Sequence, residues 1–228
     1  MRNRMLLSWS GGKDAAWTLH RMRQTGTDVV ALITTVTSGY ERISMQGIRR
    51  TVLHAQAAAA GLPLIEVLIP QACDNGTYED AFASGLRTAG TCWAGIHEIA
   101  FGDLFLQDIR DYRVQMLGRH GWDVRTPLFG SDTALLAREM QAGGLEANVC
   151  CVDTQQLSAD FAGRPFDASL LRELPAHADP CGENGEFHTC VHAGPMFSRP
   201  LRIVRGETVL RDARFAYTDF ELEGPSAL

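Results

Sequence analysis

The feature that most constrains the fold is a glycine-rich turn near the N-terminus, between a short apolar run and a helical pattern. Residues 5–9 are mainly apolar, Ser10-Gly11-Gly12-Lys13-Asp14 follows, and residues 14–23 carry the helical pattern. A strand that enters such a turn and continues as a helix collects unpaired backbone N–H groups and the positive helix end at one point. The two glycines let the backbone approach an anion, and the lysine adds a positive charge. This glycine loop (residues 10–14) therefore predicts a phosphate site.

Two common phosphate-binding motifs do not match the loop. Its spacing differs from the GxxxxGK[ST] of P-loop proteins and from the GxGxxG of dinucleotide-binding proteins. A second interpretation is a tight strand-to-helix turn with an exposed lysine and no ligand. The position of the loop favours the phosphate site, because ligands of open α/β sheets bind at the carboxyl edge.

The first half of the chain alternates short apolar runs with helical patterns, which is typical of a mainly parallel sheet. The run at residues 29–34 is almost continuously apolar, as in central strands covered on both faces. We expect strands over residues 5–9, 29–34, 64–69, 98–101 and 123–127, and helices over residues 14–23, 48–60, 77–88 and 104–119. The pattern predicts a Rossmann-like α/β domain over residues 1–130.

The pattern changes after Gly130. A helix is expected over residues 133–142 and a strand over residues 147–152, and a loop-rich stretch follows with several prolines. Short strands without intervening helices are expected over residues 187–191, 201–204, 208–211 and 213–221. Residues 131–228 therefore predict a smaller α+β domain.

Composition excludes several classes of protein. The chain has 228 residues, 45% of them hydrophobic, and a formal net charge of -6. This charge argues against a broad nucleic-acid-binding surface, and the longest apolar runs fall short of the roughly 20 residues that cross a membrane. The opening Met1-Arg2-Asn3-Arg4 has the charge of a signal peptide, but the apolar run after it ends at the glycine loop. The six cysteines lack the density of a disulfide scaffold, so we expect reduced thiols in the cytoplasm.

The glycine loop resembles the pyrophosphate loop of the adenine nucleotide alpha hydrolase-like ATP pyrophosphatases. This resemblance implies that the protein binds ATP with Mg²⁺, adenylates a substrate oxygen and releases pyrophosphate. Members of this group usually carry Ser after the aspartate, where this chain has Ala15.

A second motif lies in residues 179–189, which combine two glycines, two glutamates and an asparagine before an apolar run. Without a ligand, this glutamate loop (residues 179–189) is an Asn-Gly turn with solvated glutamates. It resembles the Gly-Glu-x-Gly-Glu-Phe-x-Thr signature of the diphthine-ammonia ligase family. Further matches to that family are Phe101-Gly102-Asp103, Ile109-Arg110 and residues 126–130.

The family resemblance implies an ATP-dependent amide ligase that adenylates a carboxylate and amidates it with ammonium. It implies ATP contacts from Ser8, Ser10, Gly11, Gly12, Lys13, Asp14, Thr34, Gly102, Asp103 and Arg110. It implies an acceptor side of Glu183, Asn184, Gly185, Glu186 and Thr189, with Lys13, Glu183 and Glu186 catalytic and Asp14 as a magnesium ligand. Relatives often carry His where this chain has Gln46. The alanine- and arginine-rich composition indicates a bacterial-type member, whose acceptor is a small-molecule or protein carboxylate other than that of elongation factor 2.

Three other interpretations remain open. A tRNA-thiolating ATP pyrophosphatase would share the glycine loop, although the chain has no CxxC pair for persulfide chemistry. A zinc site could use His188, Cys190 and His192, which alternate and so share one face of a strand, with Cys181 nearby. The protein could also bind nucleotides without catalysis, with Ala15 and Gln46 as signs of lost activity. A homodimer is compatible with the sequence as well.

Overall fold

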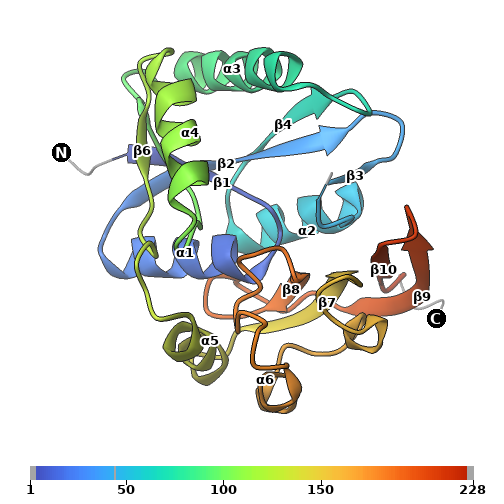
Figure 1. Ribbon diagram of the computed structural model, residues 1–228. Coiled ribbons are helices and arrows are strands. Elements are labelled where there is room, and N and C mark those ends of the chain that lie inside the picture. Colours follow the sequence, from blue (N-terminus) through green and yellow to red (C-terminus); the bar gives the residue numbers. More distant parts are fainter. Residues whose placement is uncertain (1–3, 44, 225–228) are drawn as a thin grey trace.

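The structure is a computed structural model that describes residues 4–43 and 45–224 (Figure 1). The charged opening at residues 1–3 therefore lies outside the described part. Its first half contains β1 (Arg4–Ser8), α1 (Lys13–Gln24), β2 (Asp28–Thr37), β3 (Arg42–Ile43), α2 (Arg50–Ala60), β4 (Leu64–Ile69), α3 (Asn75–Cys92), β5 (Glu98–Ala100), α4 (Gln107–Gly118) and β6 (Asp123–Arg125). Its second half contains α5 (Thr133–Ala142), β7 (Glu146–Asp153), the 3₁₀ turn η1 (Ala159–Phe161), α6 (Ala168–Glu173), β8 (Phe187–Ala193), β9 (Ile203–Arg211) and β10 (Phe215–Leu222).

The first half forms a mainly parallel sheet of order β3-β2-β1-β5-β6, with β4 paired to β2. Only the short β3 runs antiparallel, next to the end of β2. The predicted Rossmann-like α/β arrangement is confirmed. The expected strand over residues 64–69 matches β4 residue for residue, because Gly61 in the left-handed conformation ends α2 just before it.

The second half forms a separate antiparallel sheet of order β8-β7-β10-β9, which confirms the expected α+β character. The separate strands expected over residues 201–204 and 208–211 are wrong, since one continuous strand, β9, runs from Ile203 to Arg211. It pairs with β10 along almost its whole length, and a bulge between Thr218 and Phe220 absorbs the irregularity that looked like a break. Helix α6 and strand β3 were not predicted, because each is too short to show a periodic pattern of apolar residues.

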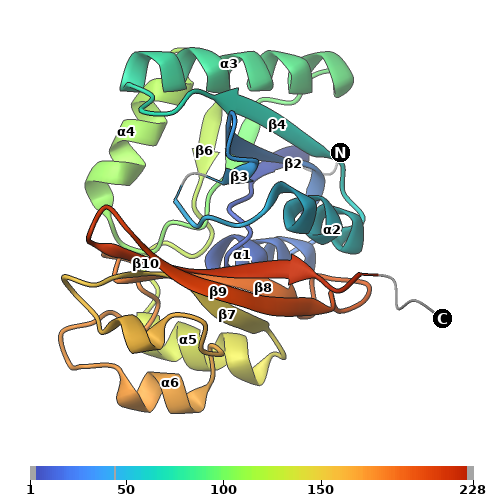
Figure 2. The same ribbon diagram turned by 90° about the vertical axis from the view of Figure 1, so that its right-hand side faces the viewer.

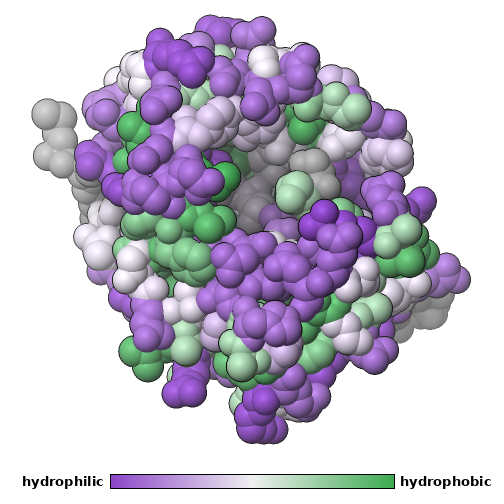
Figure 3. Space-filling model, in the orientation of Figure 1, coloured by the Kyte–Doolittle hydropathy of each residue, from purple (hydrophilic) through white to green (hydrophobic). Residues whose placement is uncertain are grey.

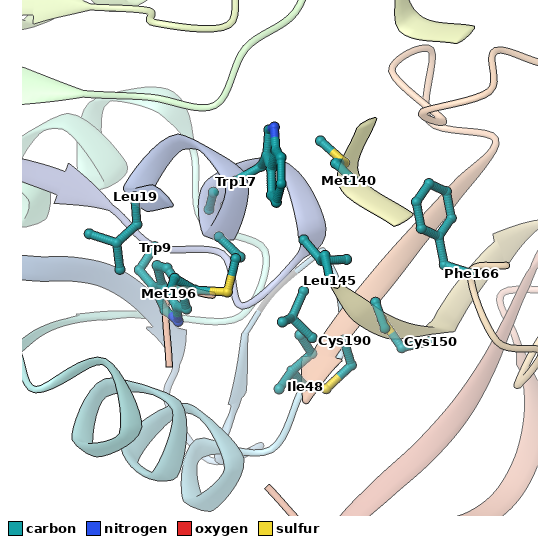
Figure 4. Close-up of a cluster of buried hydrophobic side chains, with 14 of the residues drawn as sticks. Trp9, Trp17, Leu19, Ile48, Met140, Leu145, Cys150, Phe166, Cys190 and Met196 are labelled. Carbon is teal, nitrogen blue, oxygen red and sulfur yellow. The ribbon is translucent and has the colours of Figure 1, made fainter. Parts of the chain in front are cut away.

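The two sheets and their helices form a layered molecule (Figure 2). Helix α1 lies between the sheets, α3 covers the far side of the first sheet, and α5 and α6 cover the far side of the second. One buried cluster connects both halves, and Figure 4 shows Trp9, Trp17, Cys150, Phe166 and Cys190 within it. Because this core is continuous, the division into domains 1–130 and 131–228 stays a prediction.

The cysteines and the helix lengths bear on two of the expectations from composition. All six cysteines are free thiols. None of the helices described over residues 4–43 and 45–224 has the length and apolar character that crossing a membrane requires.

Candidate active site

A cavity of about 480 Å³ opens between the carboxyl edge of the first sheet and the glutamate loop of the second half. Figure 3 shows the corresponding hollow in the middle of one face, with hydrophobic surface beside it on the side of α4. The cavity wall includes Ser8, Ser10, Gly12, Lys13, Asp14, Gly102, Asp103, Glu183, Asn184, Gly185 and Thr189. The structure therefore brings most of the residues expected for ATP and for the acceptor to one place.

The glycine loop needs glycine at two positions for different reasons. Gly11 has φ of +75°, and a Cβ there would lie 2.9 Å from the side-chain oxygen of Gln56. A Cβ on Gly12 would lie 3.1 Å from the carbonyl oxygen of Thr189. The first glycine therefore makes the turn, and the second lets β8 approach the loop.

Gln56 holds the glycine loop in place from behind. Its fully buried amide donates to the carbonyl oxygens of Gly11 at 3.0 Å and Val191 at 2.7 Å, and it accepts from the indole N–H of Trp9 at 3.0 Å. The backbone N–H of Val191 also donates to Gly11. This residue was not among the predicted ones, because a glutamine inside an alanine-rich helix carries no local signal of such a role.

Lys13 connects the two loops. Its side chain is only 2% exposed, and its ammonium donates to Asp14 Oδ2 at 2.8 Å and to the carbonyl oxygen of Cys181. Burial works against the charged form, but Asp14 and the other negative groups nearby outweigh it and raise the pKa of Lys13. The ammonium therefore stays positive at neutral pH.

Thr189, which was expected to contact the acceptor, contacts the glycine loop. Its hydroxyl accepts a hydrogen bond of 3.0 Å from the backbone N–H of Lys13, the first residue of α1. The N-cap residue Gly12 has no side chain to do this. A residue 176 positions away therefore supplies the helix cap.

Glu183 closes the cavity on the side of β5. Its Oε1 accepts from the backbone N–H groups of Leu104 at 2.8 Å and Phe105 at 3.4 Å. Burial raises the pKa of this carboxyl, although those N–H groups oppose the shift. The side chain thus faces the cavity and ties the glutamate loop to the segment after β5.

Glu186 belongs to the glutamate loop but is not part of the cavity wall. Its Oε1 accepts from the backbone N–H of Asp179 at 2.8 Å and from the amide of Asn184 at 3.1 Å. Its buried Oε2 has no hydrogen-bond partner within the described part of the chain. The side chain is 1% exposed. This geometry fits a residue that shapes the loop.

The segment after β5 supplies a second buried carboxylate. Asp103 lies 3.0 Å from Nε of Arg113, and burial raises its pKa against the effect of that guanidinium. Gly102 allows close contact with α1, since a Cβ there would lie 2.9 Å from the carbonyl carbon of Asp14. This contact sets the distance between the glycine loop and Asp103.

Three predicted ATP contacts are absent from the cavity wall, namely Gly11, which makes the turn of the glycine loop, Thr34 and Arg110. Arg110 faces a different cavity and stacks on Phe129 at 4.7 Å, whereas Arg113, one turn later on α4, lines the active-site cavity. Thr34 is buried within β2 and is absent from the cavity wall. A helix pattern cannot decide between two arginines three positions apart, since both lie on similar faces.

The far end of the cavity contains residues that the sequence analysis did not select. Asp153 and Arg214 form a two-pronged ion pair of 2.9 and 2.6 Å, which lowers the pKa of the aspartate. Gln156 and Phe215, which were not predicted either, line the same cavity, together with the predicted Asn184 and with His188 of the alternative zinc site. The two charged residues lie opposite one another where β7 ends and β10 begins, so strand pairing was the only signal that could have identified them.

The segment with Met45 and Gln46 forms another wall of the cavity. Arg42 and Arg49 on either side of it both donate to the carboxylate of Asp219, at distances of 2.5 to 3.1 Å. These bonds overcome burial and lower the pKa of Asp219. The segment is thereby fixed to β10.

His188 gives the protein a testable pH dependence. Burial and the charge of Lys13 lower the pKa of His188 from 6.5 to about 4. Between these values the unfolded chain binds a proton that the folded protein does not, so stability falls as pH drops from 7 toward 4. At pH 5 the free energy of unfolding is lower by about 2 kcal/mol than at pH 7 because of this residue. We expect His188→Gln to reduce that difference. Urea denaturation of both proteins at pH 7 and 5 measures this, and an equal acid loss in the variant contradicts it.

The cavity has one oxygen suited to a metal ion. Asp14 Oδ1 is buried and has no hydrogen-bond partner among the described residues, while Oδ2 accepts from Lys13. Within residues 4–43 and 45–224, no group of three His, Cys, Asp or Glu side chains is placed to hold a metal by itself, and this includes the strand with His188, Cys190 and His192. A magnesium ion held here would therefore need oxygens from a bound ligand, as is usual for Mg²⁺ with phosphates.

Comparisons with known proteins agree with this arrangement. The family model described as the diphthamide synthase N-terminal domain matches residues 2–119, slightly more than half of the chain. The model described as the diphthamide synthase C-terminal domain matches residues 132–219. No curated protein matches the chain. The two matches include both loops that form the cavity.

Proposed function

We propose that this chain, which belongs to the diphthamide synthase family, is an ATP-dependent ligase that adenylates an acceptor carboxylate and amidates it with ammonium. The observation that carries the proposal is the contact between the glycine loop and the glutamate loop through Lys13. Either loop alone has a simpler explanation as a turn. Their joint presence in one cavity fits an enzyme that brings a nucleotide and an acceptor together.

The nucleotide side would consist of the glycine loop and the segment after β5. The N–H groups in the first turn of α1 and the ammonium of Lys13 suit the charge of a leaving pyrophosphate. Asp14 Oδ1 would contribute to a magnesium ion that also binds phosphate oxygens. ATP would supply the adenylyl group, which makes the carboxylate reactive toward ammonia.

The acceptor side would consist of the glutamate loop and the far end of the cavity. Glu183 would hold ammonium or accept its proton, and its raised pKa brings it closer to that task. We assign Glu186 the role of positioning Asp179 and Asn184, since its contacts lie within the loop. Under this proposal residues 1–130 carry the nucleotide and residues 131–228 the acceptor, and the enzyme works in the cytoplasm. A bacterial-type origin and a homodimer stay predictions.

Isotope labelling tests the reaction. Purified protein would be incubated with ATP, Mg²⁺, ¹⁵N-ammonium and a small-molecule and protein extract, and the products would be analysed by mass spectrometry. The proposal predicts a ¹⁵N-labelled amide that appears only with ATP and in equal amount to AMP. ATP binding without any labelled product would favour a nucleotide-binding protein without ligase activity. If tRNA is added and thionucleosides form in place of a labelled amide, a thiolating enzyme is favoured.

Glu183→Gln separates the two half-reactions. The amide can still accept the N–H of Leu104, so the loop contact remains, but the negative charge for ammonium is lost. We expect ¹⁵N incorporation to fall at least about tenfold while ATP affinity changes less than about threefold. Labelling and ATP titration of the variant measure this. An unchanged rate of amide formation would remove Glu183 from the mechanism.

A further inference from the structure

A second cavity, of about 510 Å³, lies apart from the active site and shares no residue with its wall. It is bounded by α1, the start of β1, α4, β6 and the segment after β6. Three arginines from three different elements line it, namely Arg21, Arg110 and Arg125. Thr25, Thr27 and Thr126 add hydroxyl groups.

The positive charge in this cavity is only partly balanced. Arg21 pairs with Glu139 at 2.6 Å, and Arg125 pairs with Glu98. Among residues 4–43 and 45–224, no carboxylate lies within ion-pair distance of Arg110. Its guanidinium lies over the ring of Phe129 instead. Three guanidinium groups against two carboxylates leave one positive charge in excess.

One donor in this cavity lacks an acceptor, and one positive charge lies at an unfavourable helix end. The Nε atom of Arg21 is buried, and none of the residues that the structure describes gives it a hydrogen-bond partner. A buried polar group of this kind is unfavourable unless an acceptor reaches it. Arg110 stands in the first turn of α4, where the helix dipole disfavours a positive charge. An anion bound between these two residues would remove both costs.

We propose that this cavity is a second binding site, for the oxyanion group of a small molecule, either a phosphate or a carboxylate. Guanidinium groups bind both in a two-pronged geometry, and the threonine hydroxyls can donate to further oxygens. The site is independent of the proposed ligase reaction, because none of its residues lines the active-site cavity.

Calorimetric titration with inorganic phosphate and, separately, with glutarate tests the site and distinguishes the two sources of the oxyanion. We expect one or both to bind with about millimolar affinity, and Arg110→Gln to weaken that binding at least about tenfold. Arg138→Gln is the matched control, since Arg138 is exposed on α5 and outside the cavity. It should bind like the unchanged protein.

The Nε–Hε resonance of Arg21 gives a second, local readout by NMR. It should shift when the bound anion is added, and it should not shift in Arg110→Gln at the same concentration. No binding of either anion at about 10 mM would overturn the proposal. Equal binding by the Arg110 and Arg138 variants, or a shift elsewhere without one at Arg21, would overturn it as well.

Discussion

Lys13→Met should lower the rate of AMP formation at least about a hundredfold, because a charge aimed at the leaving pyrophosphate contributes that much or more. Methionine keeps the length of the side chain but removes the ammonium that binds Asp14 and the carbonyl of Cys181. The residue is buried, so its loss leaves Asp14 without a partner. Steady-state release of pyrophosphate measures the effect.

A double variant separates catalysis from stability. Lys13→Met combined with Asp14→Asn removes both members of the ion pair, so it should unfold at a higher urea concentration than the single variant. If the double variant regains stability and remains inactive, lower stability does not account for the lost activity. A double variant that regains both stability and activity would show that Lys13 has only a structural role.

Gln56→Leu should destabilise the protein by about 3–5 kcal/mol, since it leaves the indole N–H of Trp9 and the carbonyl of Val191 buried without partners. It should also weaken ATP binding at least about tenfold, because Gly11 loses one of the bonds that fix the glycine loop. Urea denaturation and ATP titration measure the two effects.

Gln141→Leu is the matched control for this change. Gln141 stands on α5 and makes only a long contact of 3.4 Å, to the carbonyl of Phe166. We expect its replacement to lower the free energy of unfolding by less than about 1 kcal/mol and to leave the ATP affinity unchanged. Equal effects from the two variants would mean that the buried bonds of Gln56 do not hold the loop.

The sequence predicted the elements well where a repeating pattern was long or a strong stop signal was present. Helix α5 begins and ends where expected, because Asp132 caps its start and Gly143 follows its end. Strand β9 was divided in two, because Gly206 and the bulge in its partner β10 interrupt the alternation. Pairing with β10 decides the extent of this strand, and pairing is invisible in a single segment.

The candidate site was predictable to the extent that its residues lie within the two loops. Lys13 and Glu183 lie there, and both face the cavity. Thr189 and Glu186 were also found in the loop, but their contacts differ from the expected ones. One caps α1 and the other supports its own loop. Contacts between positions more than a hundred residues apart depend on how the two sheets pack, which no local motif contains.

The residues at the far end of the cavity show the same limit. Asp153 and Arg214 are ordinary charged residues in sequence, and only the pairing of β7 with β10 brings them together as an ion pair. Arg113 replaced Arg110 in the cavity for a related reason. The rotation of α4 against the first sheet, and not the helical pattern itself, determines which arginine enters.

The central claim is that the cavity between the two loops cleaves ATP between its α and β phosphates. Phosphorus NMR of ATP incubated with the protein, Mg²⁺, ammonium and an extract that contains the acceptor tests this most directly. We predict resonances of AMP and pyrophosphate in equal amounts, and their loss in Lys13→Met. ADP and inorganic phosphate as the products, in amounts that depend on the protein, would contradict the account.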